Sequence, residues 1–175
     1  LGLDDSRGLS ALAERMAAFM IKAAREAKLY TSWTNPDDGY EGAVQDFVRE
    51  SLDARRSGAF LQDFFETVQL TCLAGCVTSL TQLVIKTLAP GVPDIYQGSE
   101  LWDLSLVDPD NRSLVDYPMR HTYLKEDRDA VTLLPRWRSG VVKLAVLRAA
   151  LTVRARFGSD IVDADYVPLE VEGPR

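Results

Sequence analysis

The sequence predicts a mainly α-helical, bundle-like chain with one or two short strands. Apolar residues recur at spacings of three and four over four long stretches, and only two short runs are rich in β-branched residues. Strands do not alternate with helices as they would in a complete α/β barrel. A chain of 175 residues with 46% apolar and 26% charged residues is long enough to bury a core. We therefore expect the four helical stretches to pack together as one core.

The first two predicted helices run from Leu9 to Ala27 and from Tyr40 to Leu52, and each has one apolar face. The polar segment between them contains Pro and Gly, which end the first helix. Asn35 before Pro36 is the expected cap of the second helix, because Pro is favoured in a first turn. The cap candidates of the first helix are Asp4, Asp5 and Ser6.

A third helix is predicted from Phe60 to Leu88, where Pro90 and Gly91 end it. Its central run, Leu70 to Ile85, has no charge but contains Thr, Ser and Gln, and it falls short of about 20 strongly apolar residues. We expect a buried helix and no membrane span. The two cysteines, Cys72 and Cys76, are expected to be buried thiols, because no CxxC pair or nearby histidine accompanies them.

The second half of the chain is less regular. Val92 to Tyr96 is short and partly β-branched, so it predicts a brief strand or extended segment. Residues Ser99 to Asp129 show no sustained periodicity of apolar residues, so this stretch is expected to be rich in loops. A last helix is predicted from Ser139, its cap, to Phe157, with Gly158 as a left-handed C-cap. Ile161 to Val171 is expected to be extended.

The charge of the chain argues against some classes of partner. A formal net charge of −6 and a pI near 4.8 disfavour nucleic acid and membrane surfaces, which attract basic proteins. No secretory signal is visible, and nothing in the cysteine usage indicates an oxidising compartment, so a cytoplasmic location is expected. The chain begins at Leu1 and ends at Arg175 without a natural stop, so both ends look cut. No cofactor and no metal site are expected.

The densest cluster of rare and polar residues lies between Pro90 and Tyr117. It contains the pattern Gly-x-Pro-x-x-Tyr-x-Gly-x-Glu, which resembles the eighth-strand region of α-amylase-family barrels. The residues of this pattern are Gly91, Pro93, Tyr96, Gly98 and Glu100. Longer strings are similar to the maltooligosyltrehalose synthases in particular: Ile95 to Asp103, Ser105 to Arg112, Val115 to Tyr117, Tyr30 to Pro36 with Tyr40 and Glu41, and Asp165 to Gly173.

The resemblance implies that the chain is a C-terminal piece of a (β/α)8-barrel enzyme. Residues 1–89 would be a helical insertion and the helix before barrel strand eight. Residues 90–158 would be the strand-eight region, a sugar-side loop and the last barrel helix, and residues 159–175 the start of a C-terminal β domain. The implied activity is that of an isomerase, a glucosylmutase of trehalose biosynthesis. It converts the reducing-end α-1,4 bond of a maltooligosaccharide into an α,α-1,1 bond.

The resemblance also implies that this chain carries no catalytic residue. The family uses three carboxylates on strands four, five and seven, and such retaining chemistry needs a close carboxylate pair at the anomeric carbon. The strand-seven aspartate lies in a His-Asp motif. The only histidine here, His121, is followed by Thr122, so the three carboxylates should precede Leu1 in the parent enzyme. The chain alone is expected to be inactive.

The implied substrate contacts belong to a pocket wall. The candidates are Trp33, Tyr96, Glu100, Trp102, Asp110 and Arg112. Each has a simpler interpretation. Tyr96 and Trp33 are also typical of packing residues. Asp108, Asp110 and Arg112 are also typical of a loop that stabilises itself, and with Asn111 the aspartates match part of a calcium loop that lacks the Gly and the final Glu.

Two other functions remain open at this point. The chain also fits a helical module that binds glycans or is purely structural, and a piece of another α-amylase-family hydrolase.

Overall fold

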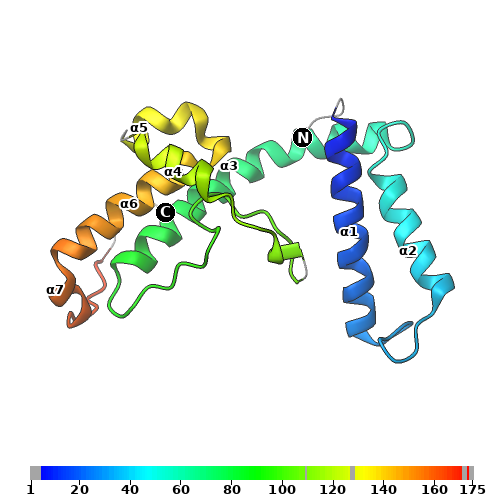
Figure 1. Ribbon diagram of the computed structural model, residues 1–175, viewed down its shortest axis with the longest axis horizontal. Coiled ribbons are helices and arrows are strands. Elements are labelled where there is room, and N and C mark those ends of the chain that lie inside the picture. Colours follow the sequence, from blue (N-terminus) through cyan, green and yellow to red (C-terminus); the bar gives the residue numbers. More distant parts are fainter. Residues whose placement is uncertain (1–4, 109, 127–128, 171–172, 174–175) are drawn as a thin grey trace. The chain divides into compact units, whose positions relative to one another are not determined.

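The computed structural model describes residues 5–108, 110–126, 129–170 and 173 (Figure 1). The mainly helical prediction is confirmed. The elements in order are α1 Ser6–Ala27, α2 Asp38–Ser51, α3 Gly58–Leu88, the 3₁₀ turn η1 Asp110–Arg112, α4 Tyr117–Lys125, α5 Ala130–Leu133, the 3₁₀ turn η2 Leu134–Ser139, α6 Val141–Arg156 and α7 Gly158–Val162.

The expected strands do not form within the described ranges. Val92 to Tyr96 is irregular, because a strand needs a neighbouring strand to pair its N–H and C=O groups. Ile161 and Val162 end α7, and residues 163–170 have no regular structure. Val171 lies outside the described residues. For the described residues, the prediction of short strands is therefore wrong, and the alternative of an extended segment without strand pairing at Val92 to Tyr96 stays a prediction.

The chain divides into two compact units. Unit 1 consists of Leu1–Leu73 and Ser105–Ser113, and unit 2 of Ala74–Leu104 and Leu114–Arg175. The expected single core is therefore wrong. Short connections favour packing between sequence neighbours, so α1 packs on α2 within unit 1, and α6 packs on α4, α5 and η2 within unit 2.

In unit 1, α1 and α2 form a helical hairpin. The α1 residues that face its core recur every four positions, at Leu9, Ala13, Ala17 and Ile21, and the small alanines allow the helices to lie close together. Val48 is their buried partner on α2.

Aspartate side chains cap both of these helices. Asp5 accepts from the Gly8 amide at 2.8 Å, as expected from its position, and Asp37 accepts from the Tyr40 amide at 2.9 Å. The prediction that Asn35 caps α2 is wrong. Its amide donates to Ser32 Oγ at 3.0 Å and its carbonyl accepts from the Ser32 amide, so Asn35 lies in a turn before the helix. Asp4 lies outside the described residues.

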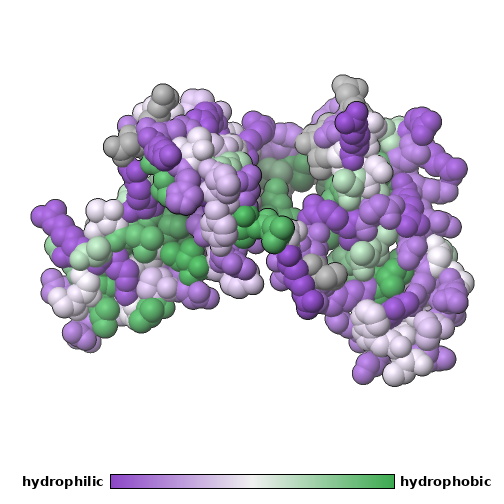
Figure 2. Space-filling model, in the orientation of Figure 1, coloured by the Kyte–Doolittle hydropathy of each residue, from purple (hydrophilic) through white to green (hydrophobic). Residues whose placement is uncertain are grey.

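Helix α3 is continuous through Gly75, but it is not the buried helix that the sequence predicts. Leu61, Leu83 and Thr87 are buried, whereas Leu70 is 75% exposed and Ile85 62% exposed. By length and composition alone, α3 is the one helix among the described residues that fits a membrane span. In unit 2, apolar side chains gather on the visible face over α6 and the second half of α3 (Figure 2). Contiguous exposed apolar surface of this kind is typical of interfaces.

The core of unit 2 forms around the start of α6. Leu133, Val141 and Val142 make its centre, and Trp102 and Trp137 pack against them. Gly140 enters α6 in the left-handed region with φ of +79° and lies directly against the backbone of Leu101 and Trp102. The prediction that Ser139 caps α6 is wrong, because Gly140 is the cap residue and Ser139 ends η2, with its hydroxyl 3.4 Å from the Val141 amide.

Three further features of unit 2 differ from expectation or add to it. Helix α4 forms inside the expected loop, because Asp116 caps it by accepting from the Met119 amide at 2.9 Å.

Gly158 begins α7 and has no left-handed conformation, so its predicted role as a C-cap is wrong. The end of α3 is capped by Arg154, which donates to the carbonyls of Thr87 and Ala89 at 2.7 and 3.1 Å.

Candidate functional site

The six candidate substrate-binding residues divide between the two units. Unit 1 contains Trp33, Asp110 and Arg112, and unit 2 contains Tyr96, Glu100 and Trp102. Each set is described within its own unit.

Asp110 is held by helix α1. Arg15 donates to the two carboxylate oxygens of Asp110 from Nε at 2.8 Å and from Nη2 at 2.7 Å. The Leu106 amide donates to the same carboxylate at 2.6 Å. These bonds favour the charged form, and the Arg15 guanidinium is the larger cause, so the pKa of Asp110 falls from 3.8 to about 2. Both oxygens are therefore engaged in fixing the loop 105–113 to α1.

Arg112 extends from the same loop and is mostly exposed. It pairs with Asp108 four residues before it, and Lys22 of α1 donates to the Asp108 carbonyl at 2.8 Å. Lys22 also lies 3.9 Å from the Asp108 carboxylate. Arg15 and Lys22 of α1 thus fix this loop in place. The Arg112 side chain extends from the loop into solvent.

Trp33 lies in the loop between α1 and α2, where it packs on a cation. The Arg25 guanidinium carbon lies 4.9 Å from the centre of the indole ring. Arg25 in turn donates to Glu41 from Nε at 2.8 Å and from Nη2 at 2.6 Å. The Thr31 hydroxyl donates to Glu41 at 2.6 Å and accepts from the Asp37 amide at 3.0 Å.

Glu41 is a buried carboxylate in this network, with only 6% of the residue exposed. The hydrogen bonds from Arg25 and then from Thr31 lower its pKa from 4.5 to about 2. Buried charge is tolerated only with complete pairing, which the fork of Arg25 and the Thr31 hydroxyl supply. Glu41 therefore fixes the loop that carries Trp33.

One face of α1 connects the two parts of the unit 1 site. Arg15, Lys22 and Arg25 lie seven and three residues apart, which places them on the same side of a helix. Arg15 holds Asp110 and Arg25 holds Trp33. Ten residues of α-helix separate these two anchors by about 15 Å along the axis.

The acid sensitivity of unit 1 follows from the two lowered pKa values. A carboxyl group whose pKa falls on folding contributes stability above its unfolded pKa, and this is lost as pH falls through the folded value. The windows run from 4.5 to about 2 for Glu41 and from 3.8 to about 2 for Asp110. We expect the urea midpoint of unit 1, followed by the Trp33 indole signal in ¹H–¹⁵N spectra, to fall across this range. The double variant Glu41→Gln, Asp110→Asn should be less stable at pH 6 and show a shallower fall. An equally steep fall in the variant would contradict this assignment.

In unit 2, Glu100 closes a turn together with Arg120 of α4. Its carboxylate accepts from the Gly98 amide and from Arg120 Nε, both at 3.0 Å. Arg120 also donates to the Gly98 carbonyl at 2.7 Å. Gly98 needs its left-handed φ of +91° for this turn. The turn is therefore fixed by a partly buried ion pair.

The two aromatic candidates of unit 2 differ in exposure. Tyr96 is largely exposed, so it does not take the core position of the alternative interpretation. Trp102 packs against the core, its indole N–H donates to the Trp137 carbonyl, and the Lys143 ammonium lies 5.6 Å from its ring centre. The contacts of Trp102 are thus those of a packing residue with a satisfied N–H.

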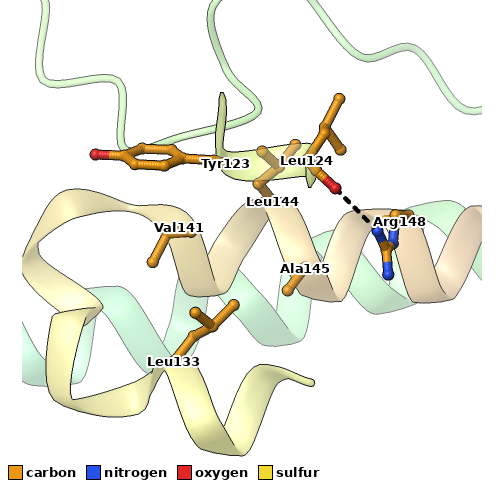
Figure 3. A pocket seen from close by; sticks show the side chains of 7 residues that line it. All are labelled: Tyr123, Leu124, Leu133, Val141, Leu144, Ala145 and Arg148. Carbon is orange, nitrogen blue, oxygen red and sulfur yellow. Dashed lines mark hydrogen bonds between the residues drawn. The ribbon is translucent and has the colours of Figure 1, made fainter. Parts of the chain in front are cut away.

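Two hollows, one in each unit, are lined mainly by apolar side chains. Figure 3 shows a cavity in unit 2 of about 10 Å³, which is room for about one water molecule. Its lining residues are Tyr123, Leu124, Leu133, Val141, Leu144, Ala145 and Arg148. Unit 1 has a wider groove of about 590 Å³ between α1, α2 and the start of α3, lined by Met20, Phe47, Phe60 and Phe64 among others. Neither hollow brings several candidate residues together.

The structure adds residues that sequence reasoning did not select. Arg25, Arg15 and Arg120 hold the candidates Trp33, Asp110 and Glu100 in place. Thr31 supports Arg25 through Glu41. The regular spacing of basic residues on α1 was the available signal for two of them. Among the described residues, no group of three or more His, Cys, Asp or Glu side chains forms a metal site.

Comparisons with known proteins agree on one family. No family model matches the chain. It is 37% identical over 171 residues to proteins described as putative maltooligosyl trehalose synthases of two Mycobacterium tuberculosis strains, which covers 94% of this chain and 20% of theirs. It also matches a crystal structure of a maltooligosyl trehalose synthase, with a TM-score of 0.86 at 30% identity over 98% of this chain and 23% of that one.

A second solved structure, the maltooligosyltrehalose synthase from Arthrobacter ramosus, matches with a TM-score of 0.70 at 34% identity. That match covers 84% of this chain and 19% of the other. In sequence and in fold, the chain is therefore a homologue of one segment of the maltooligosyl trehalose synthases, and it spans about one fifth of their length.

Proposed function

We propose that this chain serves as a non-catalytic segment of an enzyme that forms trehalose ends on maltooligosaccharides. The observation that carries the proposal is the match to maltooligosyl trehalose synthases over 94% of the chain in sequence and 98% in fold. Such an enzyme is a glucosylmutase. It transfers the terminal glucosyl link from O4 to O1 of the reducing glucose, so no water is consumed and no sugar is released.

The part that this chain plays is structural support and sugar contact. The catalytic carboxylates of an α-amylase-type barrel would come from the rest of the enzyme, and the strand-eight region would begin near Gly91. The exposed apolar surface of α3 supports this proposal, because a helix of that composition needs a covering partner within a larger protein. We place this enzyme in the cytoplasm, with no cofactor.

The proposal predicts activity for the complete reading frame that contains this chain, and none for the chain alone. Purified protein is incubated with maltopentaose, and the loss of reducing ends is measured. The complete protein should convert the reducing ends to a non-reducing product, and the 175-residue chain should leave them unchanged, since the proposal assigns the catalytic carboxylate pair to the rest of the enzyme.

Product analysis provides the control. Release of free glucose or formation of longer chains would indicate a hydrolase or a transglycosylase of the same clan, which would overturn the proposal. Conversion by the chain alone would overturn the claim that it is non-catalytic.

A further inference from the structure

The loop between α1 and α2 carries two exposed aromatic rings, each supported from behind. Tyr30 packs on Tyr40 with ring centres 5.3 Å apart, and Trp33 packs on Arg25 at 4.9 Å. Trp33 is nevertheless 57% exposed. Within unit 1 the indole therefore fills no core, and it leaves a large apolar surface in contact with water.

The support under Trp33 is rigid. Arg25 is fixed by two hydrogen bonds to one carboxylate, and that carboxylate is buried and also bonded to the Thr31 hydroxyl. A planar guanidinium held in this way cannot turn away from the ring without leaving Glu41 unpaired. The indole is therefore presented to solvent in one orientation, which lowers the entropy cost of binding a ligand.

We propose that Trp33 stacks on a glucosyl ring of a maltooligosaccharide and that Arg25 and Glu41 are positioning residues for its indole. The choice of ligand rests on the proposed function. The C–H face of a glucose ring is apolar and flat enough to lie on an indole, and the hydroxyls around it remain in water. Rigid aromatic side chains with few rotatable bonds are well suited to such contacts.

The test is a titration of the full chain with maltoheptaose, followed by the indole N–H signals in ¹H–¹⁵N spectra. Trp33, Trp102 and Trp137 each give one signal, so the last two are internal controls. We expect the Trp33 signal to move and saturate in the millimolar range, with the other two unchanged. No movement of the Trp33 signal at saturating sugar would overturn the proposal.

The positioning role is tested with Glu41→Gln, which keeps the shape of the side chain and removes the charge that orients Arg25. We expect the dissociation constant to rise roughly three- to tenfold, the range of one cation–π contact, and the Trp33 indole to become more mobile in ¹⁵N relaxation. Arg25→Lys keeps the cation without the fork and should give an intermediate value. Arg25→Met should give the weakest binding of the three.

The matched control is Glu14→Gln. Glu14 accepts from Arg49 Nε at 2.8 Å and from Nη2 at 3.0 Å, so an ion pair of the same bidentate geometry, but more exposed, is removed within unit 1 and away from Trp33. Sugar binding and indole mobility should be those of the wild type. If Glu41→Gln behaves like Glu14→Gln, then Arg25 and Glu41 do not position the indole.

Kinetics of the complete protein separate this inference from the proposed function. Trp33→Leu should raise KM and leave kcat unchanged, because the contact is equal in the ground state and the transition state. An active enzyme with an unchanged KM in this variant would overturn the role of Trp33 alone. A complete protein that forms no trehalose ends but still shows the Trp33 shift would overturn the proposed function alone.

Discussion

Gly140→Ala should destabilise unit 2 by about 3 kcal/mol, since a left-handed conformation costs an L-residue about 1–2 kcal/mol and a forced overlap about 1–3 kcal/mol more. Gly140 has φ of +79°, and a Cβ there would lie 2.8 Å from the Trp102 amide nitrogen and 2.9 Å from the Leu101 Cβ. The backbone atom cannot move aside without disturbing the core beside it. We expect the thermal midpoint of unit 2 to fall by roughly 12–24 °C.

Gly75→Ala is the control for this prediction. Gly75 lies within α3, and an added Cβ would meet nothing within 4 Å. Alanine is favoured over glycine in a helix interior, so this variant should gain up to about 1 kcal/mol. Calorimetry measures the thermal midpoint of unfolding of both variants. Equal midpoints would show that the close approach at Gly140 does not limit the packing of α6.

Leu133→Ala should remove about 2–4 kcal/mol from the free energy of unfolding of unit 2, the range of buried leucine truncations. Leu133 is 2% exposed and packs on Val141 and Val142. The cavity of Figure 3 already adjoins it, so truncation would enlarge an existing void. Urea unfolding followed by the fluorescence of Trp102 and Trp137 measures the change.

The adjacent leucine provides a matched control. Leu134 is 50% exposed, so Leu134→Ala should cost less than about 1 kcal/mol. The same substitution one residue apart then differs only in burial. Comparable losses in the two variants would mean that the core of unit 2 does not lie between α5 and the start of α6.

The helices were predictable because their signals are local. The apolar residues that mark α1, α2, α3 and α6 recur at helical spacing within single stretches of sequence, and the cap at Asp5 lies next to the helix that it caps. Helix α4 was missed because it is short and none of its residues is fully buried, so it has no sustained apolar face in the sequence. The extended segment at Val92 to Tyr96 has strand-like residues, but strand formation depends on a partner that lies elsewhere in sequence.

The site was less predictable than the fold, for a physical reason. Asp110 and Trp33 were chosen from their residue types and from a resemblance, but their partners Arg15 and Arg25 are set by tertiary structure. The division of the helices between two units is likewise a property of packing. Whether the six candidates contact sugar stays a prediction.

The ion pair between Arg15 and Asp110 joins residues that are synthesised at different times, which has a consequence for folding during translation. These residues lie 95 positions apart, and the loop that carries Asp110 is encoded after the first part of unit 2. At the usual pace of translation, about 5–20 residues per second, Asp110 is made roughly 5–20 s after Arg15. During that interval Asp108 and Asp110, which bind Lys22 and Arg15 in the folded chain, are not yet synthesised. A stall between residues 73 and 105 would therefore leave a nascent hairpin that is open to chaperones and proteases.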